Sequence, residues 1–350
     1  MAPEEEEEDP PTDPAPEFRE LFKRRREDIL FCQAAAGDGL PVYAGSSDGG
    51  VYAIAPTPEA EDETAEPFGG HSSYVTGITA VEGGAVLVSG GYDRHLIWHR
   101  RESGTEIRRQ RAHEKWLRGV EAAPGGMVVA SVADDMVCRL WDATSGTLLH
   151  ELRGHDAETP HHYPSMLFAC AFDPSGSRLA TVDKPGNIVL WSVADGSRIG
   201  ALEAPGMYTW DPKARRHSIG GIRSVAFSPD GHLIAVGGMG EVGNIDHLGG
   251  KARIEIFDIA SGERLAELES NTFNGLVESL AFTPDARYLV AGGGDNNGFL
   301  LAVDISTEKI VAESKTDFHV HSISLDRDTT IVAVGHQHVG SWLLEQVTPA

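Results

Sequence analysis

Three groups of residues in this chain are of types that do chemistry in other proteins. Residues 45–49 read Gly-Ser-Ser-Asp-Gly and match the G-x-S-x-G pattern of a serine nucleophile. Residues 238–243 match the G-x-G-x-x-G pattern of a dinucleotide-binding loop. Both patterns need a helix directly after them, but residues 50–54 read as a strand and residues 244–250 do not favour a helix. We therefore interpret the first as a hairpin turn and the second as an enlarged loop.

The third group consists of four histidines near the C-terminus. His319 and His321 alternate on one expected strand, while His336 and His338 alternate at the end of the next. A hairpin between these strands would bring His319 opposite His336, and three or four imidazoles on one sheet face suit zinc or nickel. No nearby Asp or Glu has the spacing to complete such a site. We therefore predict no bound metal or cofactor, and a polar or pH-sensitive rim is the main interpretation.

The elements that must position these residues come from an internal repeat. Gly-His or Ala-His occurs at His71, His113 and His155, separated each time by the same interval of about forty residues. In the second copy, residues 128–131 and 137–142 read as strands, with a turn at residues 134–135 between them. A fixed period of this length predicts a modular fold built from short strands.

Residues 113–142 resemble a WD repeat, including the Trp141-Asp142 pair. In that family a His, a Ser or Thr, an Asp and a Trp form a buried hydrogen-bonded network. The resemblance implies two full sets, which are His113, Ser131, Asp135 and Trp141, and, one copy earlier, His71, Ser89, Asp93 and Trp98. The third copy keeps His155, Thr181 and Trp191. Pro185 stands where its Asp should be, so we expect a weaker clamp there.

Fainter copies extend the pattern over nearly the whole chain. The Trp position recurs at Ile54, Trp98, Trp141, Trp191, Phe257, Val303 and Leu344. We therefore predict an all-β fold, a seven-bladed β-propeller of four-stranded antiparallel blades that spans residues 16–347. The expected blades are residues 29–68, 72–111, 114–153, 164–203, 219–268, 276–315 and 318–346.

The last blade has room for only three strands of its own. We expect residues 17–23 to supply the fourth, which would join the two ends of the chain and cover an exposed sheet edge. The alternative is a short helix, because Phe18, Leu21 and Phe22 also fit helical spacing.

Composition limits the possible classes of function. The net charge of −24 argues against binding to nucleic acid, which needs clustered Lys and Arg. The sequence has no apolar run long enough to span a membrane. Residues 1–15 are acidic and rich in Pro, which predicts a disordered tail rather than a signal peptide. We expect a cytoplasmic protein, and we expect Cys32, Cys138 and Cys170 to be free thiols.

Three long loops suggest where a partner would bind. They comprise residues 156–165, 205–220 and 239–251, and in WD-repeat propellers loops of these kinds emerge on one face that commonly binds partners. Their residues include aromatic and arginine types that are enriched in binding hot spots, such as Tyr163, Met207, Tyr208, Trp210, Arg215 and Arg216. The alternative is that Tyr208 and Trp210 pack inward and only hold their own loop.

The repeat alignment also places one residue of each blade near the mouth of the central channel. These residues are Leu30, Thr76, Arg118, Phe168, Arg223, Glu278 and His321, with Tyr74 and Trp116 two positions earlier in their blades. The resemblance implies a partner-binding surface made of Tyr74, Trp116, Arg118, Phe168, Tyr208, Trp210, Arg223 and His321. Ordinary exposure or local packing is the alternative interpretation.

Together these patterns predict a non-catalytic interaction scaffold. It would bind a protein or peptide on the face that carries the inter-blade loops, without nucleic acid, membrane or cofactor, and could be a subunit of a larger complex. The alternative is a metal-binding or enzymatic propeller with a His-rich site at the channel mouth. That site would use His319, His321 and His336, with His161, His162 or His217 from the loops.

Overall fold

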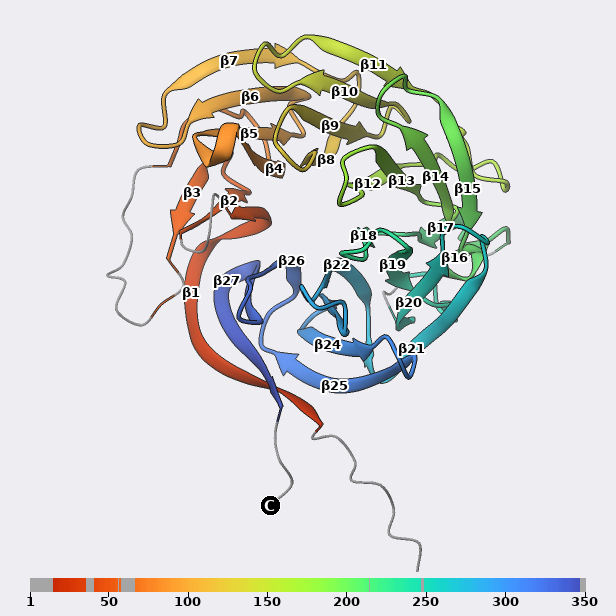
Figure 1. Cartoon of the computed structure of the whole chain (residues 1–350). Helices are drawn as coiled ribbons and strands as arrows, with labels where there is room; N and C mark the ends of the chain where they lie inside the picture. The colour runs from red at the N-terminus through yellow and green to blue at the C-terminus, as the bar shows by residue number, and fades with distance from the viewer. Residues whose placement is uncertain are drawn as a thin grey trace, which may run out of the picture.

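The computed structural model describes residues 15–35, 41–55, 57, 67–213, 215–246 and 249–346. These residues form a ring of antiparallel sheets around a central channel (Figure 1). They include two short 3₁₀ turns, η1 (Glu82–Gly84) and η2 (Pro205–Met207), and no α-helix. The acidic segment 1–14, predicted to be a disordered tail, lies outside the described residues. The chain is therefore an all-β propeller, as its repeat pattern predicts.

Five blades have four strands each. One contains β4 (Val75–Val81), β5 (Val86–Gly91), β6 (His95–Arg100) and β7 (Glu106–Arg111). The next contains β8 (Leu117–Ala122), β9 (Val128–Ala133), β10 (Cys138–Asp142) and β11 (Leu148–Leu152), and it is followed by β12 (Leu167–Phe172), β13 (Arg178–Asp183), β14 (Asn187–Ser192) and β15 (Arg198–Glu203). The last two contain β18 (Ser224–Phe227), β19 (Leu233–Met239), β20 (Lys251–Asp258) and β21 (Arg264–Asn274), and then β22 (Leu276–Phe282), β23 (Tyr288–Gly294), β24 (Gly298–Asp304) and β25 (Lys309–Thr316).

A sixth, five-stranded sheet closes the ring. Its order is β26 (Val320–Leu325), β27 (Thr330–Gln346), β1 (Pro16–Ala35), β2 (Val42–Ser46) and β3 (Val51–Ile54). The long loop between β15 and β18 adds a separate hairpin of β16 (Tyr208–Asp211) and β17 (His217–Gly220).

The prediction of seven separate blades is wrong, because the described residues form six. The residues expected to form the first and last blades share the five-stranded sheet. The reason is that β1 is one long strand with two partners. Its first part pairs with β27 from Pro16 to Ile29, and its last part pairs with β2 from Leu30 to Ala35. Hydrogen bonding therefore continues from one expected blade into the other.

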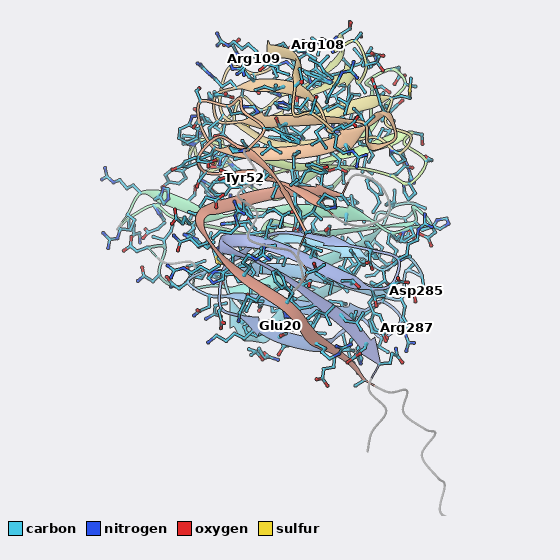
Figure 2. The ribbon with its side chains drawn as sticks, turned by 90° about the vertical axis from the view of Figure 1, so that its left-hand side faces the viewer. Glu20, Tyr52, Arg108, Arg109, Asp285 and Arg287 are labelled. Atoms are coloured by element: carbon cyan, nitrogen blue, oxygen red, sulfur yellow. The ribbon has the colours of Figure 1, made fainter. Side chains whose placement is uncertain are left out.

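The first and last strands of the described chain, β1 and β27, are paired. Figure 1 shows the red end of β1 beside the dark blue end of β27, and the edge-on view of Figure 2 shows β1, with Glu20 labelled, running along the rim of the ring. Phe18 is buried in a cluster with Phe318 and Trp342, while Leu21 is 39% exposed. This in-and-out alternation is that of a strand, so the helical alternative for this segment does not hold.

The hydrophobic core lies between neighbouring blades rather than at the centre of the ring. One cluster joins Leu140 and Leu152 of one blade to Phe172 and Trp191 of the next, and others repeat this arrangement around the ring. The middle strands of each blade are buried on both faces, which explains their nearly continuous runs of Val, Leu, Ile and Ala.

Buried histidines connect the loops before three blades to the strands inside them. His113 bonds Ser131 Oγ through Nε2 (2.8 Å) and Asp135 through Nδ1 (3.1 Å), and Trp141 Nε1 donates to the same Ser131 oxygen. His71 makes equivalent contacts of 2.9 Å to Asp93 and to Ser89.

The third histidine network is complete, contrary to the expectation drawn from Pro185. His155 bonds Thr181 Oγ1 (2.8 Å), which also accepts a hydrogen bond from Trp191 Nε1, and its Nδ1 lies 2.7 Å from Asp183 Oδ2. Asp183 lies two residues after Thr181 on the same strand, so both side chains point to the same face and reach one imidazole.

In the network of His71, the residue expected to bond Ser89 was Trp98, but this prediction is wrong by one residue. Trp98 pairs with Val88, so its side chain faces away from Ser89, and its Nε1 donates to Ala143 O in the next blade. His99 takes its place, with Nε2 3.3 Å from Ser89 Oγ. A shift of one residue along a strand changes the face, which is why the two adjacent side chains have different roles.

We expect Phe18→Ala to lower the free energy of unfolding by about 3 kcal/mol, because Phe18 anchors the closing strand in the core. Leu21→Ala on the outer side of the same strand should cost less than about 1 kcal/mol. Urea midpoints of the two variants measure this difference. Equal effects would contradict the register of β1.

The third network predicts a second contrast. Asp183→Ala should lower the free energy of unfolding by about 3 kcal/mol, because it leaves His155 and the backbone amide of Asn187 without their buried acceptor. Pro185→Ala should lower the free energy of unfolding by less than about 1 kcal/mol, since Pro185 is not part of the network. Thermal unfolding compares the two variants, and a larger loss at Pro185 would refute this assignment.

Candidate functional site

The mouth of the central channel is lined by bulged residues. The innermost strands β1, β4, β8, β12, β22 and β26 each skip one residue in pairing with the next strand. The skipped residues are Phe31, Thr76, Arg118, Phe168, Glu278 and His321. A bulge re-aims the extra side chain, and all six line one cavity of about 260 Å³ with Arg223, which directly precedes β18. The same β-bulge, repeated in most blades of the ring, therefore directs one side chain from each of those blades into the channel mouth.

In β1 the repeat alignment of the sequence is wrong by one residue. Leu30, predicted to lie at the mouth, is fully buried with Val42 and Val334, and Phe31 lines the cavity instead. The bulge falls at Phe31, so that residue turns toward the channel while Leu30 stays in the core between strands.

Two arginines share one aromatic ring at the mouth. The guanidinium of Arg223 lies 3.7 Å from the centroid of the Phe168 ring, and that of Arg118 lies 5.8 Å from it. Arg118 is held by two hydrogen bonds of 2.8 Å to the Asp134 carboxylate. Arg223 donates to Gly220 O, and its Nε is buried without a hydrogen-bond partner. Within the described residues, no carboxylate therefore lies within salt-bridge distance of the Arg223 guanidinium.

Burial lowers the pKa of Arg223, and the nearby Glu278 carboxylate opposes that shift. Because a guanidinium stays protonated in proteins, Arg223 keeps its charge. Lys184 is also buried beside this site. Its pKa is lowered mainly by burial and, to a smaller extent, by repulsion from Arg223. The mouth is therefore locally cationic in a protein whose net charge is −24.

A row of aromatic rings runs along the other side of the mouth. Neighbouring ring centroids are 5.3 Å apart between Phe31 and Tyr74, 5.6 Å between Tyr74 and Tyr92, and 4.7 Å between Tyr92 and Trp116. The last two rings are stacked in parallel, and Arg118 lies over both. Tyr74 is 45% exposed and Trp116 is 52% exposed. This is an apolar surface open to solvent.

Tyr92 was missed by the sequence analysis, although a repeat signal marks it. Tyr92, Asp134 and Lys184 each follow the second strand of their blade, and their amides donate to the carbonyls of Tyr74, Trp116 and Met166. His336 stands in the same relation to His319. Alignment of this position in each blade would have identified a second ring of residues at the mouth.

The three long loops lie together. His161 stacks on Trp210 at 3.6 Å, Tyr208 Oη donates to Thr159 Oγ1, and the Val242 amide donates to Thr209 Oγ1. Tyr208 thus holds neighbouring loops together, while Trp210 is 40% exposed. Neither residue lines the channel cavity, whereas Arg118, Phe168, Arg223 and His321 do. Tyr74 and Trp116 join that group through Tyr92, on which both rings pack.

The histidines of the last blade divide into two sets. His319 and His321 lie beside Glu278, and the possible ligand atoms of these three residues all lie within 4.8 Å of one another. His336 is exposed, with its ring centroid 6.0 Å from that of His321. His338 turns away and stacks on Phe318.

Glu278 supplies the carboxylate that the histidines lacked in the sequence analysis. It comes from β22 in the neighbouring blade, where the repeat alignment placed it at the mouth in the position equivalent to His321, but without linking it to a metal site. The loop residues His161, His162 and His217 are not part of this cluster.

Neither enzyme-like motif has the structure its chemistry needs. Residues 45–49 form the turn between β2 and β3, with Gly49 at φ +92°, and a strand follows. Residues 240–250 connect β19 to β20. The three cysteines are free thiols, and burial raises the pKa of Cys32 to about 12. The described residues include no helix with the length and apolar character to cross a bilayer.

A family model described as PQQ_2, outer membrane protein assembly factor BamB, matches residues 47–342. Among curated proteins, eukaryotic translation initiation factor 3 subunit I of Candida albicans is 27% identical over 205 residues, which are 55% of this chain and 48% of that protein. WD repeat-containing protein VIP3 of Arabidopsis thaliana is 27% identical over 210 residues, 59% of each chain. Apoptotic protease-activating factor 1 of Rattus norvegicus is 27% identical over 177 residues, 50% of this chain and 12% of that protein. The chain thus spans about half or less of the length of these relatives.

The channel predicts a pH effect at Glu121, which lines the cavity below the mouth. Its side chain is exposed to the channel, but the protein that encloses the channel partly desolvates the carboxylate and raises its pKa to about 7. Between pH 4.5 and 7 the unfolded chain ionises this group before the folded chain does, so the wild type loses stability as the pH rises. Glu121→Gln should therefore match the wild type in melting temperature near pH 4 and exceed it at pH 8. Glu102→Gln at an exposed turn is the control, and the same pH dependence in both variants would refute the assignment.

Proposed function

We propose that this chain, which belongs to the β-propeller family described as PQQ_2, outer membrane protein assembly factor BamB, and is a WD-repeat propeller, acts as an interaction scaffold. One relative is named as a subunit of a translation initiation factor, which supports a role among protein partners. We further propose that it works in the cytoplasm, because its three free thiols suit a reducing compartment.

The observation that carries the proposal is the row of exposed aromatic rings beside the cationic part of the mouth. Trp, Tyr and Arg are the residues most enriched in binding hot spots. Tyr92 and Arg223 line the channel cavity, and the rings of Tyr74 and Trp116 pack on Tyr92 at its edge. The rings of Tyr92 and Trp116 are already stacked, so little side-chain freedom would be lost on binding.

The chemistry of this surface defines its partner. The exposed rings favour an aromatic or apolar side chain, and Arg223 favours a carboxylate placed next to it. The strongly acidic remainder of the protein would repel a long acidic stretch, so the partner needs one carboxylate rather than many. A protein segment with an acidic residue beside an aromatic one fits best.

Trp116 also gives this segment a direction. A second cavity, lined by Tyr92, Asp93, Lys115 and Trp116, lies next to the channel cavity and shares Tyr92 with it. An extended segment that crosses Trp116 would reach both cavities. Arg94 and Lys115 in the second cavity are offset by Asp93, Glu114 and Asp134, so this cavity would favour a polar group rather than an acidic one.

Selection of peptides from a random display library on the full-length chain tests the proposal. We expect the selected peptides to contain an aromatic and an acidic residue. Trp116→Ala should weaken their binding by roughly 30-fold, as expected for a hot spot of about 2 kcal/mol. Calorimetry or fluorescence anisotropy measures the affinity, and Ile199→Ala, at a 51% exposed position on the outer strand β15, should leave it unchanged.

Trp210→Ala separates the two candidate surfaces. If peptides lose affinity for this variant and keep it for Trp116→Ala, the binding surface is the loop cluster and not the channel mouth. If the library yields no peptide that depends on Trp116, the proposed mouth site is wrong.

A further inference from the structure

A cluster of metal-binding side chains lies on one side of the channel mouth, where β22 and β26 meet. Glu278 and His321 are both bulged residues, and His319 lies two positions before His321 on the same face of the chain. The bulges therefore aim a carboxylate and an imidazole into one space, and strand alternation adds a second imidazole.

The orientation of His319 leaves its coordinating nitrogen free. Nδ1 lies 3.1 Å from the Asp295 carbonyl oxygen, to which it can only donate, so Nε2 of the neutral ring carries the lone pair. A backbone carbonyl on the other ring nitrogen is the usual way in which proteins orient a metal-binding histidine. The His319 side chain is only 9% exposed, so this orientation is fixed by its surroundings.

Two buried nitrogen atoms in this cluster have no hydrogen-bond partner. They are Nε2 of His319 and Nε2 of His321. The first lies 3.7 Å from Glu278 Oε1, so a lone pair faces a carboxylate oxygen across a gap too long for a hydrogen bond. A buried polar atom without a partner is costly, and a cation between these three groups would satisfy all of them at once.

We propose that Glu278, His319 and His321 bind a divalent transition metal ion of the zinc type at the channel mouth. Two imidazole nitrogens and one carboxylate oxygen form a donor set that zinc accepts in proteins. This inference concerns a different set of residues from the aromatic row, and goes beyond the proposed scaffold function.

The distances fit such an ion after a small adjustment. Ligands about 2.0–2.1 Å from a tetrahedral zinc lie roughly 3.3 Å from one another. The ligand atoms here lie within 4.8 Å, with the His319 to Glu278 distance at 3.7 Å. The Glu278 side chain is 21% exposed and has room to turn toward the imidazoles.

The charges around the cluster set the strength of the site. Arg223 and Arg118 act on Glu278 electrostatically, and both oppose a bound cation. Among the described residues, the Glu278 carboxylate nevertheless lies within 4 Å of His319 Nε2 and of no arginine nitrogen. Coordination positions toward the cavity would be filled by water, or by the exposed His336, whose ring lies 6.0 Å from that of His321. Three protein ligands with an open position resemble a catalytic rather than a structural zinc site.

Titration of the full-length chain with Zn²⁺ and with Co²⁺ tests the proposal. Calorimetry should show one ion bound per chain with an affinity in the micromolar range or tighter, and Co²⁺ should develop the visible absorption of a four- or five-coordinate ion. His319→Ala, His321→Ala and Glu278→Gln should each weaken Zn²⁺ binding by roughly 100-fold or more.

His338→Ala is the matched control, because His338 is close in sequence and turns away from the cluster. It should bind Zn²⁺ like the wild type, as should Trp116→Ala, which separates this site from the proposed peptide surface. Near-ultraviolet circular dichroism of the metal-free variants establishes that they fold. The proposal is wrong if the wild type binds neither ion, or if a folded His319→Ala/His321→Ala double variant binds Zn²⁺ as tightly as the wild type.

Discussion

The pairing of β1 with β27 is the interaction on which the rest of this structure depends. A propeller blade buries its faces only against its neighbours, so the ring is stable only when the first and last strands meet. The inner strands also come very close around the channel. A Cβ atom on Gly77 would lie 2.5 Å from the backbone nitrogen of Val120 in the next inner strand. Closure of the ring therefore brings together side chains from distant parts of the sequence.

The sequence predicts those parts of the fold that depend on local pattern. Strand alternation, the Trp-Asp pair and the turn between the second and third strands lie within one repeat, so the antiparallel blades and most of their boundaries follow from them. The blade count failed because β1 serves two expected blades, a property of its pairing partners rather than of its residues. Trp98 failed because a strand exchanges its faces at every residue, so an alignment error of one position put His99 in its place. The expectation from Pro185 failed because Asp183, two residues earlier and on the same face as Thr181, reaches the histidine instead.

The candidate site was predictable to the same extent. Arg118, Phe168, Glu278 and His321 were placed at the mouth because they hold equivalent positions in the repeat alignment, and the bulge occurs at those positions. The bulge itself was not visible in the sequence, which is why Leu30 was chosen instead of Phe31. Individual contacts between blades could not be predicted. The repeat alignment put Glu278 and His321 at the same level of neighbouring blades, but it did not show that Glu278 lies 3.7 Å from His319 or that Tyr92 stacks on Trp116.

The two proposed sites share one electrostatic environment, and this couples them. Glu278 now offsets part of the positive charge of Arg223. A divalent ion held by Glu278 would neutralise that carboxylate, and Arg223 would then attract a partner's carboxylate more strongly across the same cavity. Because such coupling is reciprocal, a partner that brings a carboxylate to Arg223 would also tighten metal binding. Metal binding at the histidines would then change the affinity of the channel mouth for its partner, although the aromatic row and the histidines lie on different strands.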